Sequence, residues 1–264
     1  MKRVALTLVL VLALCASAPA LLGAAGSLSY TAFGDSIAFG AFALPGHGYV
    51  PLYSKAVAVD NGVIVNRLNL GVPTWTSGDL RNALSRNAVF RLAAFSSKVI
   101  TVNIGGSDLN ALRSLYKQGT CGGVDNQDCL RVGILVLESN WDSILNSIRA
   151  LRKGRSTVIR AMDFYNPFVN EDKATDSWPA GGDGTSDFAE LKPYLDELNT
   201  YITASSIAKG VLVAPVYLAF NGPTGDEDAG DKGLLAFDHF HPNDRGHAVM
   251  ASLLRDLGYS TVTP

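Results

Sequence analysis

The chain has 264 residues, of which 47% are hydrophobic and 17% are charged, and its formal net charge is −2. This length and apolar content suffice for one large domain core, and they exclude an intrinsically disordered chain. The nearly balanced charge also argues against a nucleic-acid-binding protein, which needs a concentrated basic surface to contact phosphates.

The N-terminus has the pattern of a signal peptide. Lys2 and Arg3 precede an apolar run, Val4–Cys15, and small residues follow it. The apolar run is shorter than the ~20 residues that a membrane-spanning helix needs. The order of charged, apolar and small segments is typical of a cleaved export signal. We therefore expect a signal peptide over residues 1–25, a secreted or periplasmic protein and no stable membrane span after cleavage, with a retained membrane anchor as the alternative.

The rest of the chain, residues 26–264, alternates short β-rich apolar runs with longer segments of helical periodicity. This alternation predicts one α/β domain, a three-layer α/β/α sandwich around a five-stranded parallel sheet with right-handed crossovers. The predicted strands are Leu28–Phe33, Val63–Leu70, Lys98–Ile104, Ser156–Met162 and Val211–Val216. The predicted helices are Tyr49–Val59, Ser77–Phe95, Ser107–Gln118, Leu130–Leu151, Phe188–Ala208 and Asp244–Leu257.

Two cysteines, Cys121 and Cys129, lie beyond the signal peptide and are separated by a short, polar, glycine-rich connection. Exported proteins mature in an oxidising compartment, where neighbouring thiols pair. We expect the two residues to form one local disulfide that holds a surface loop. Two unrelated thiols are the alternative.

Two long segments, 163–186 and 221–233, do not fit the pattern of strands and helices. Loops of this length in a compact domain are usually functional or mobile. The second segment carries acidic residues, whose oxygens are the ligands that calcium prefers. A solvated surface loop is the favoured interpretation, and a calcium site is the alternative. The acidic residues are Asp226, Glu227, Asp228 and Asp231.

Polar clusters follow the predicted strands. In a parallel α/β sheet, ligands bind beyond the carboxyl ends of the strands, so these clusters are expected to meet at one edge. The clusters are Gly34-Asp35-Ser36-Ile37, Asn69-Leu70-Gly71-Val72-Pro73, Gly105-Gly106-Ser107-Asp108 and Asp238-His239-Phe240-His241-Pro242-Asn243.

The residue types in these clusters are those of nucleophilic acyl transfer. A serine hydroxyl attacks only when an imidazole removes its proton, and a carboxylate must orient that imidazole. Ser36 follows the first strand, and Asp238 and His241 stand three residues apart before the last helix. Taken singly, each residue is also compatible with helix capping or a structural role. Their joint occurrence favours a catalytic triad.

A metal site is the alternative use of the same histidines. Histidine and carboxylate are common transition-metal ligands, and His239, His241, His247 and Asp238 lie close together in the sequence. His247 falls inside the predicted last helix and is expected to face another way. We therefore expect a metal-independent site.

The four clusters, in this order, resemble the four sequence blocks of the GDSL/SGNH hydrolase family. The resemblance extends over about Tyr30–Leu257. It implies a flavodoxin-like SGNH hydrolase fold for residues 26–264. It also implies that Ser36 is the nucleophile, that His241 is the general base and acid, and that Asp238 is the carboxylate that orients His241.

The resemblance implies an oxyanion hole as well. Its implied donors are the N–H groups of Ser36 and Gly71, and the family's third donor is an asparagine side chain at the position that Ser107 occupies here. A serine hydroxyl also donates a hydrogen bond but reaches less far, and loss of one oxyanion donor typically costs about 10² to 10³ in rate. Ser107 is expected to donate directly or through a water. Replacement by Asn103 or Asn110, or a slower enzyme, are the alternatives.

Together these features predict a secreted serine esterase or lipase that hydrolyses carboxylic esters through an acyl-serine intermediate and needs no cofactor. The family includes lipases, phospholipases, thioesterases and carbohydrate deacetylases, so small-molecule, lipid and carbohydrate esters all remain open as substrates. Two aromatic residues that follow the nucleophile, Phe39 and Phe42, are equally compatible with a pocket wall and with the core. The alternative function, motivated by Ser107, is a catalytically impaired relative that binds a glycan or a lipid.

Overall fold

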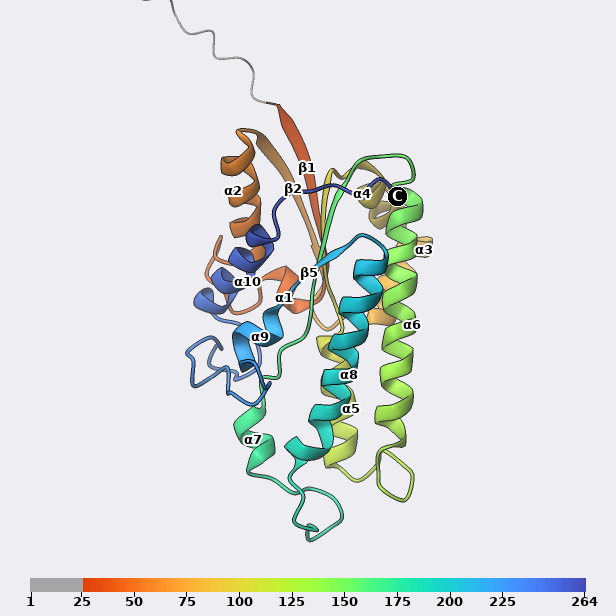
Figure 1. The fold of residues 1–264 in the computed structure, drawn as a ribbon, viewed down its shortest axis with the longest axis vertical. Coiled ribbons are helices and arrows are strands. Elements are labelled where there is room, and N and C mark those ends of the chain that lie inside the picture. Colours follow the sequence, from red (N-terminus) through yellow and green to blue (C-terminus); the bar gives the residue numbers. More distant parts are fainter. Residues whose placement is uncertain (1–25) are drawn as a thin grey trace, which may run out of the picture.

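A five-stranded parallel sheet with the strand order β2-β1-β3-β4-β5 forms the centre of the computed structural model, which describes residues 26–264 (Figure 1). The predicted signal peptide lies outside the described residues. The strands are β1 (Ser27–Gly34), β2 (Ile64–Gly71), β3 (Val99–Asn103), β4 (Val158–Met162) and β5 (Leu212–Ala214). The predicted α/β fold with a five-stranded parallel sheet is confirmed.

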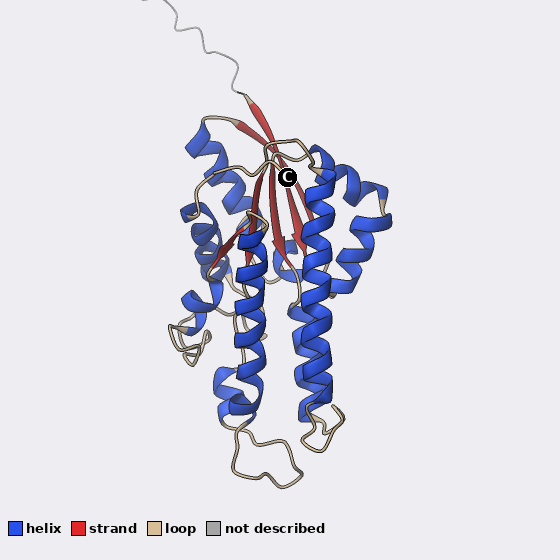
Figure 2. Ribbon diagram, turned by 45° about the vertical axis from the view of Figure 1, so that its right-hand side comes forward, coloured by secondary structure: helices blue, strands red, loops and turns tan. Residues whose placement is uncertain are grey.

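Helices cover both faces of the sheet and complete the three layers (Figure 2). One face carries the helices α3 (Ser77–Arg86), α4 (Ala88–Ser96), α5 (Gly106–Lys117), α6 (Asp128–Leu151) and α8 (Asp187–Ala208). The other face carries α1 (Ser36–Phe39), α2 (Tyr49–Asn61), α9 (Val216–Asn221) and α10 (Asp244–Asp256). The short helix α7 (Val169–Lys173) lies in the first of the two long connections.

The central strands are buried on both faces. In β3, Ile100 and Val102 pack into the core beneath the first set of helices, whereas Val99 packs into the core beneath the second set. Successive side chains of a strand point to opposite faces, so a strand between two helical layers must be apolar at nearly every position. This requirement explains why the strands were recognisable as short continuous apolar runs.

Two elements end two or more residues earlier than the sequence predicted. The segment predicted as one helix over Ser77–Phe95 is broken at Asn87, whose side chain accepts a hydrogen bond from the N–H of Val89 at 2.9 Å and begins α4. An asparagine side chain competes well for the unpaired N–H groups of a helix start, and this favours a new helix over continuation of the old one. The strand β5 ends before Pro215 because proline has no N–H to donate to the sheet.

A disulfide joins Cys121, in the connection between α5 and α6, to Cys129 in the first turn of α6. The side chain of Asn126 supports the same loop, because it accepts from the N–H of Cys121 at 2.8 Å and donates to the carbonyl of Tyr116 at 2.7 Å. Within residues 26–264, none of the helices combines the length and the apolar character needed to cross a bilayer.

Candidate active site

Three strands end at the same level and bring their following turns together. Gly34, at the end of β1, pairs with Gly71 of β2 and with Asn103 of β3. A Cβ atom on Gly34 would lie 2.1 Å from the carbonyl oxygen of Asn103, so no larger residue fits there without a shift of the strands. The glycine therefore allows the close approach of β1 and β3 immediately before Ser36.

Asp35 holds the turn that presents Ser36. Its buried side chain accepts a hydrogen bond from the N–H of Ile37 at 2.9 Å and caps α1. Burial raises the pKa of Asp35 to about 6, against the opposing effect of backbone N–H groups at Ile37 and Gly106. The contact with Gly106 connects this turn to the start of α5.

Ser36, His241 and Asp238 lie together at this edge of the sheet. Nε2 of His241 is 2.8 Å from Oγ of Ser36, and Nδ1 of His241 is 2.5 Å from Oδ2 of Asp238. The other carboxylate oxygen of Asp238 accepts from the backbone N–H of His241 at 3.1 Å and from that of Phe240 at 3.2 Å. The loop that carries both residues is thereby folded around the carboxylate.

The charges in this group suit proton transfer from serine. Although burial raises the pKa of Asp238, the hydrogen bonds from the side chain and backbone of His241 hold it below its ordinary value on balance. A carboxylate that stays ionised keeps a proton on Nδ1, so Nε2 remains the acceptor that faces the hydroxyl of Ser36.

The N–H of Gly71, which the family resemblance implies as an oxyanion donor, lies at the end of β2. This N–H donates to Oδ1 of Asn69 at 3.0 Å and is therefore already satisfied within the chain. The amide nitrogen of Asn69 in turn donates to the carbonyl of Ala38 at 2.7 Å. Asn69 thus ties the end of β2 to α1, a role that the sequence did not reveal. The glycine at position 71 is needed for packing, since a Cβ there would lie 2.3 Å from the N atom of Phe39.

Ser107 stands in the first turn of α5 and is partly buried. Its neighbours anchor the helix start. Gly106 lies close to Asp35, since a Cβ atom added at Gly106 would be 3.5 Å from Oδ2 of Asp35. The carboxylate of Asp108 accepts hydrogen bonds from the N–H and the hydroxyl of Ser77 at 2.8 and 2.7 Å. The start of α5 is therefore bonded to the start of α3 through Asp108 and contacts Asp35, the residue before Ser36, through Gly106.

Aromatic rings surround His241. The ring of Phe42 stacks on the imidazole with centroids 4.9 Å apart and an interplanar angle of 25°, and Phe240 meets it edge-on at 4.8 Å. The hydroxyl of Tyr165 donates to the carbonyl of Phe240 at 2.6 Å. The sequence marked Phe42 only as one of two aromatic residues near the nucleophile, and its contact with His241 required the folded chain.

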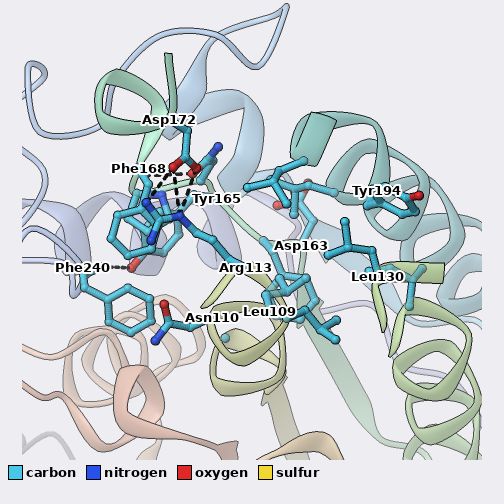
Figure 3. Close-up of a pocket in the computed structure, with 18 of the residues that line it drawn as sticks. Leu109, Asn110, Arg113, Leu130, Asp163, Tyr165, Phe168, Asp172, Tyr194 and Phe240 are labelled. Atoms are coloured by element: carbon cyan, nitrogen blue, oxygen red, sulfur yellow. Dashed lines mark hydrogen bonds and ion pairs between the residues drawn. The ribbon is translucent and has the colours of Figure 1, made fainter. Parts of the chain in front are cut away.

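An apolar pocket opens beside this group, between α5, α6 and α8 (Figure 3). Its cavity is about 90 Å³ and borders Ile37, next to the nucleophile, and Phe240, next to the histidine. The aliphatic part of the lining comprises Leu109, Leu112, Leu130, Ile134, Leu191 and Leu195.

The charged groups of the pocket are paired. Arg113 donates from Nε to the buried carboxylate of Asp172 at 3.0 Å, and its guanidinium lies 3.8 Å above the ring of Phe168 (Figure 3). Asp163 accepts from the N–H of Tyr217 at 2.8 Å, and burial raises its pKa to about 6. The pocket is thus an apolar cavity whose charged lining residues are already neutralised or hydrogen-bonded.

The histidines predicted as an alternative metal cluster do not converge. His247 is fully buried beneath α2, where its Nδ1 accepts from the N–H of Tyr49 at 3.3 Å. In the acidic loop, Asp228 accepts from backbone N–H groups of its own loop and of Asn170. Throughout residues 26–264, no group of three or more histidine, cysteine, aspartate or glutamate side chains is arranged to hold a metal ion.

Comparison with known proteins identifies the class of this protein. The model of the GDSL-like Lipase/Acylhydrolase family matches residues 32–249. The protein is an ester hydrolase. It belongs to the GDSL-like lipase/acylhydrolase family.

Relatives cover nearly the whole chain. The spore germination lipase LipC of Bacillus licheniformis is 23% identical over 236 residues, which are 88% of this chain and 97% of LipC. The lipase Lip_vut3 from a goat rumen metagenome superimposes with a TM-score of 0.71 at 21% identity, over 88% of this chain and 98% of that lipase. The acetylxylan esterase Axe2 of Geobacillus stearothermophilus superimposes with a TM-score of 0.59 at 18% identity, over 89% and 96% of the two chains.

The burial of His247 predicts a specific dependence of stability on pH. Burial lowers the pKa of His247 to about 4, whereas an unfolded histidine titrates near 6.5. Between these values the unfolded chain binds more protons, so the free energy of unfolding contributed by this group falls as the pH falls from about 6.5 to 4, by up to about 3 kcal/mol. Denaturant unfolding of the natural protein and of His247→Gln at several pH values tests this.

The free energy of unfolding of the natural protein minus that of His247→Gln should be constant above pH 7 and should decrease on acidification. Asp35 and Asp163, whose raised pKa values act in the opposite direction, are present in both proteins and cancel in the difference. A difference that stays constant down to pH 4 contradicts a neutral, buried His247.

Proposed function

We propose that this protein is an exported serine esterase or lipase in which Ser36 attacks the ester carbonyl. The observation that carries the proposal is the continuous hydrogen-bonded chain from Oγ of Ser36 through the imidazole of His241 to Asp238, with contacts of 2.8 and 2.5 Å. This is the arrangement needed to turn a weak hydroxyl nucleophile into a strong one.

The reaction follows from this geometry in two halves. Nε2 of His241 takes the hydroxyl proton as Oγ of Ser36 bonds to the carbonyl carbon, and Asp238 stabilises the resulting imidazolium. The bond between the carbonyl carbon and the alkoxide oxygen then breaks, the imidazolium protonates the alkoxide, the alcohol leaves, and the acyl group remains as an ester on Ser36. A water then gives a proton to the same Nε2 as its oxygen bonds to the acyl carbon. The imidazolium returns this proton to Oγ of Ser36 as the acyl–Oγ bond breaks, and the carboxylic acid leaves.

Two donors are proposed for the oxyanion. The N–H of Ser36 stands at the start of α1, and Ser107 lies in the first turn of α5, next to Gly106, whose N–H bonds to the carboxylate of Asp35. Donors that are already oriented lower the energy of the charged intermediate without a cost of reorganisation. The N–H of Gly71, which the family resemblance also implies as a donor, donates to Oδ1 of Asn69 in this structure.

The nucleophile is tested by Ser36→Ala. The natural protein should hydrolyse short p-nitrophenyl esters and should be labelled by a fluorophosphonate, because both reactions need an activated serine. The variant should not be labelled, and its kcat should fall by a factor of about 10³ or more, since only binding and oxyanion stabilisation remain. Hydrolysis at the natural rate by purified Ser36→Ala contradicts the assignment.

The proposed donor role of Ser107 is tested by a pair of variants. Ser107→Ala should lower kcat by about 10-fold or more with little change in KM, because an oxyanion donor acts mainly in the transition state. Ser107→Asn, which keeps a donor with longer reach, should retain or exceed the natural rate. An unchanged kcat in Ser107→Ala would remove this residue from the oxyanion hole. If neither the natural protein nor either Ser107 variant hydrolyses esters, the alternative function, a binding module, is favoured.

We further propose that the acyl part of the ester enters the apolar pocket. The pocket begins beside Ile37, next to the nucleophile, and follows α5 from Gly106 to Arg113, a distance of about 10 Å at the rise of an α-helix. Each methylene group removed from water contributes roughly 0.8 kcal/mol. An aliphatic chain of medium length therefore fits the cavity better than a polar group.

The proposed role of the pocket is tested by measuring kcat/KM for esters of different acyl-chain length. Leu109→Trp should lower kcat/KM for esters of medium-chain acids by about 10-fold or more while acetate esters are little affected, because the larger side chain fills the cavity. Leu115→Trp, on an exposed position of the same helix, is the matched control and should leave the profile unchanged. An identical chain-length profile in Leu109→Trp and the natural protein would place the acyl chain elsewhere.

Export is the proposed location. It is supported by the pattern of charged, apolar and small residues at the N-terminus and by the disulfide between Cys121 and Cys129, since disulfides persist in oxidising compartments.

A further inference from the structure

We propose that Phe42 is a positioning residue that holds the imidazole of His241 in line with Ser36. The inference rests on the proposed roles of Ser36 and His241, and it adds a residue that neither the motifs nor the comparisons single out. Three observations carry it: the contact of the ring with the imidazole, the backbone conformation of Phe42, and the way its loop is tied to both sides of the site.

The ring of Phe42 confines the imidazole from one face. Its centroid lies 4.9 Å from that of His241 with the planes 25° apart, and Phe240 closes a second side edge-on at 4.8 Å. With a further hydrogen bond from Nδ1 to Asp238, the imidazole has little freedom to tilt about its side-chain torsions. Nε2 therefore stays directed at the hydroxyl of Ser36.

The backbone at Phe42 is in a conformation that a phenylalanine rarely adopts. Its φ is +63°, in the left-handed region, where a Cβ atom collides with the following carbonyl and glycine is favoured. Core packing does not explain a large residue here, because Phe42 is 46% exposed and its other aromatic neighbour, Phe237, is 84% exposed. Strained backbone conformations of this kind cluster at functional sites, where the surrounding structure holds them in place.

The loop that carries Phe42 is hydrogen-bonded to Ser36 and to Asp244, a residue close to His241 in the sequence. The N–H of Ala41 donates to the carbonyl of Ser36 at 2.9 Å, which fixes Phe42 relative to the nucleophile. The N–H of Leu44 donates to the carboxylate of Asp244 at 2.8 Å, three residues beyond His241. The loop therefore couples two segments that are 205 residues apart in the sequence, and the ring of Phe42 sets the position of one against the other.

The test compares Phe42→Ala with Phe42→Gly. Both remove the ring, but only glycine relieves the left-handed strain. If the ring positions His241, both variants should lose about 10-fold to 100-fold in kcat with KM changed by less than about 3-fold, since a small misplacement of a catalytic group costs this much. Phe42→Gly should melt at a higher temperature than Phe42→Ala, so that loss of rate cannot be attributed to loss of stability.

Two further proteins complete the design. Phe42→Tyr keeps the ring and should retain kcat within about 2-fold. Phe95→Ala removes another partly exposed phenylalanine, which packs under Arg155 away from the site, and should leave kcat unchanged. Natural kcat in both Phe42→Ala and Phe42→Gly overturns the proposal, as does a change confined to KM, which would make Phe42 a substrate contact.

Fluorophosphonate labelling of the natural protein separates this proposal from the proposed function. If the natural protein is labelled at Ser36 and hydrolyses esters while the ring-deleted variants do so equally well, only the role of Phe42 fails. If the natural protein itself is neither labelled nor active, the proposed roles of Ser36 and His241 fail first, and the positioning role falls with them.

Discussion

The hydrogen bond of 2.8 Å between Oγ of Ser36 and Nε2 of His241 joins two segments that are 205 residues apart in the sequence. Oxygen and nitrogen must approach to within a few tenths of an ångström of this distance for a proton to pass between them. Much of the surrounding structure serves this one constraint. The sheet determines where Ser36 emerges, and the loop before α10 determines where His241 stands.

The close approach of β1 and β3 is the first means of meeting the constraint, because the missing Cβ at Gly34 lets the strand run against the carbonyl of Asn103. Polar side chains then bind the turns to one another. Asn69 bonds the end of β2 to α1, and Asp35 caps the same helix from the other side. Each is a short side chain whose hydrogen bonds satisfy backbone groups that a strand or helix end leaves unpaired.

Much of this was predictable from the sequence because it depends on local patterns. Continuous apolar runs identify strands that are buried on both faces, and the order of polar clusters after them places Ser36, Asp238 and His241 at one sheet edge. The features that the sequence did not reveal have equally local causes. The cap at Asn87 interrupts a helix whose apolar periodicity continues through it, and the N–H of Gly71 is taken by a side chain two residues earlier. Periodicity and motif spacing report neither event.

The sequence by itself determined the fold class and the family, and it indicated candidate residues for acyl transfer, because these follow from hydrophobic periodicity and from residue types at strand ends. Only the tertiary structure decided which hydrogen-bond donors remain available, where the apolar pocket lies and which aromatic ring rests on His241. Such features depend on contacts between residues far apart in the chain and on single backbone torsions. Phe42 shows this most directly. Nothing in its sequence context indicates that its backbone has a positive φ or that its ring stacks on the imidazole of His241.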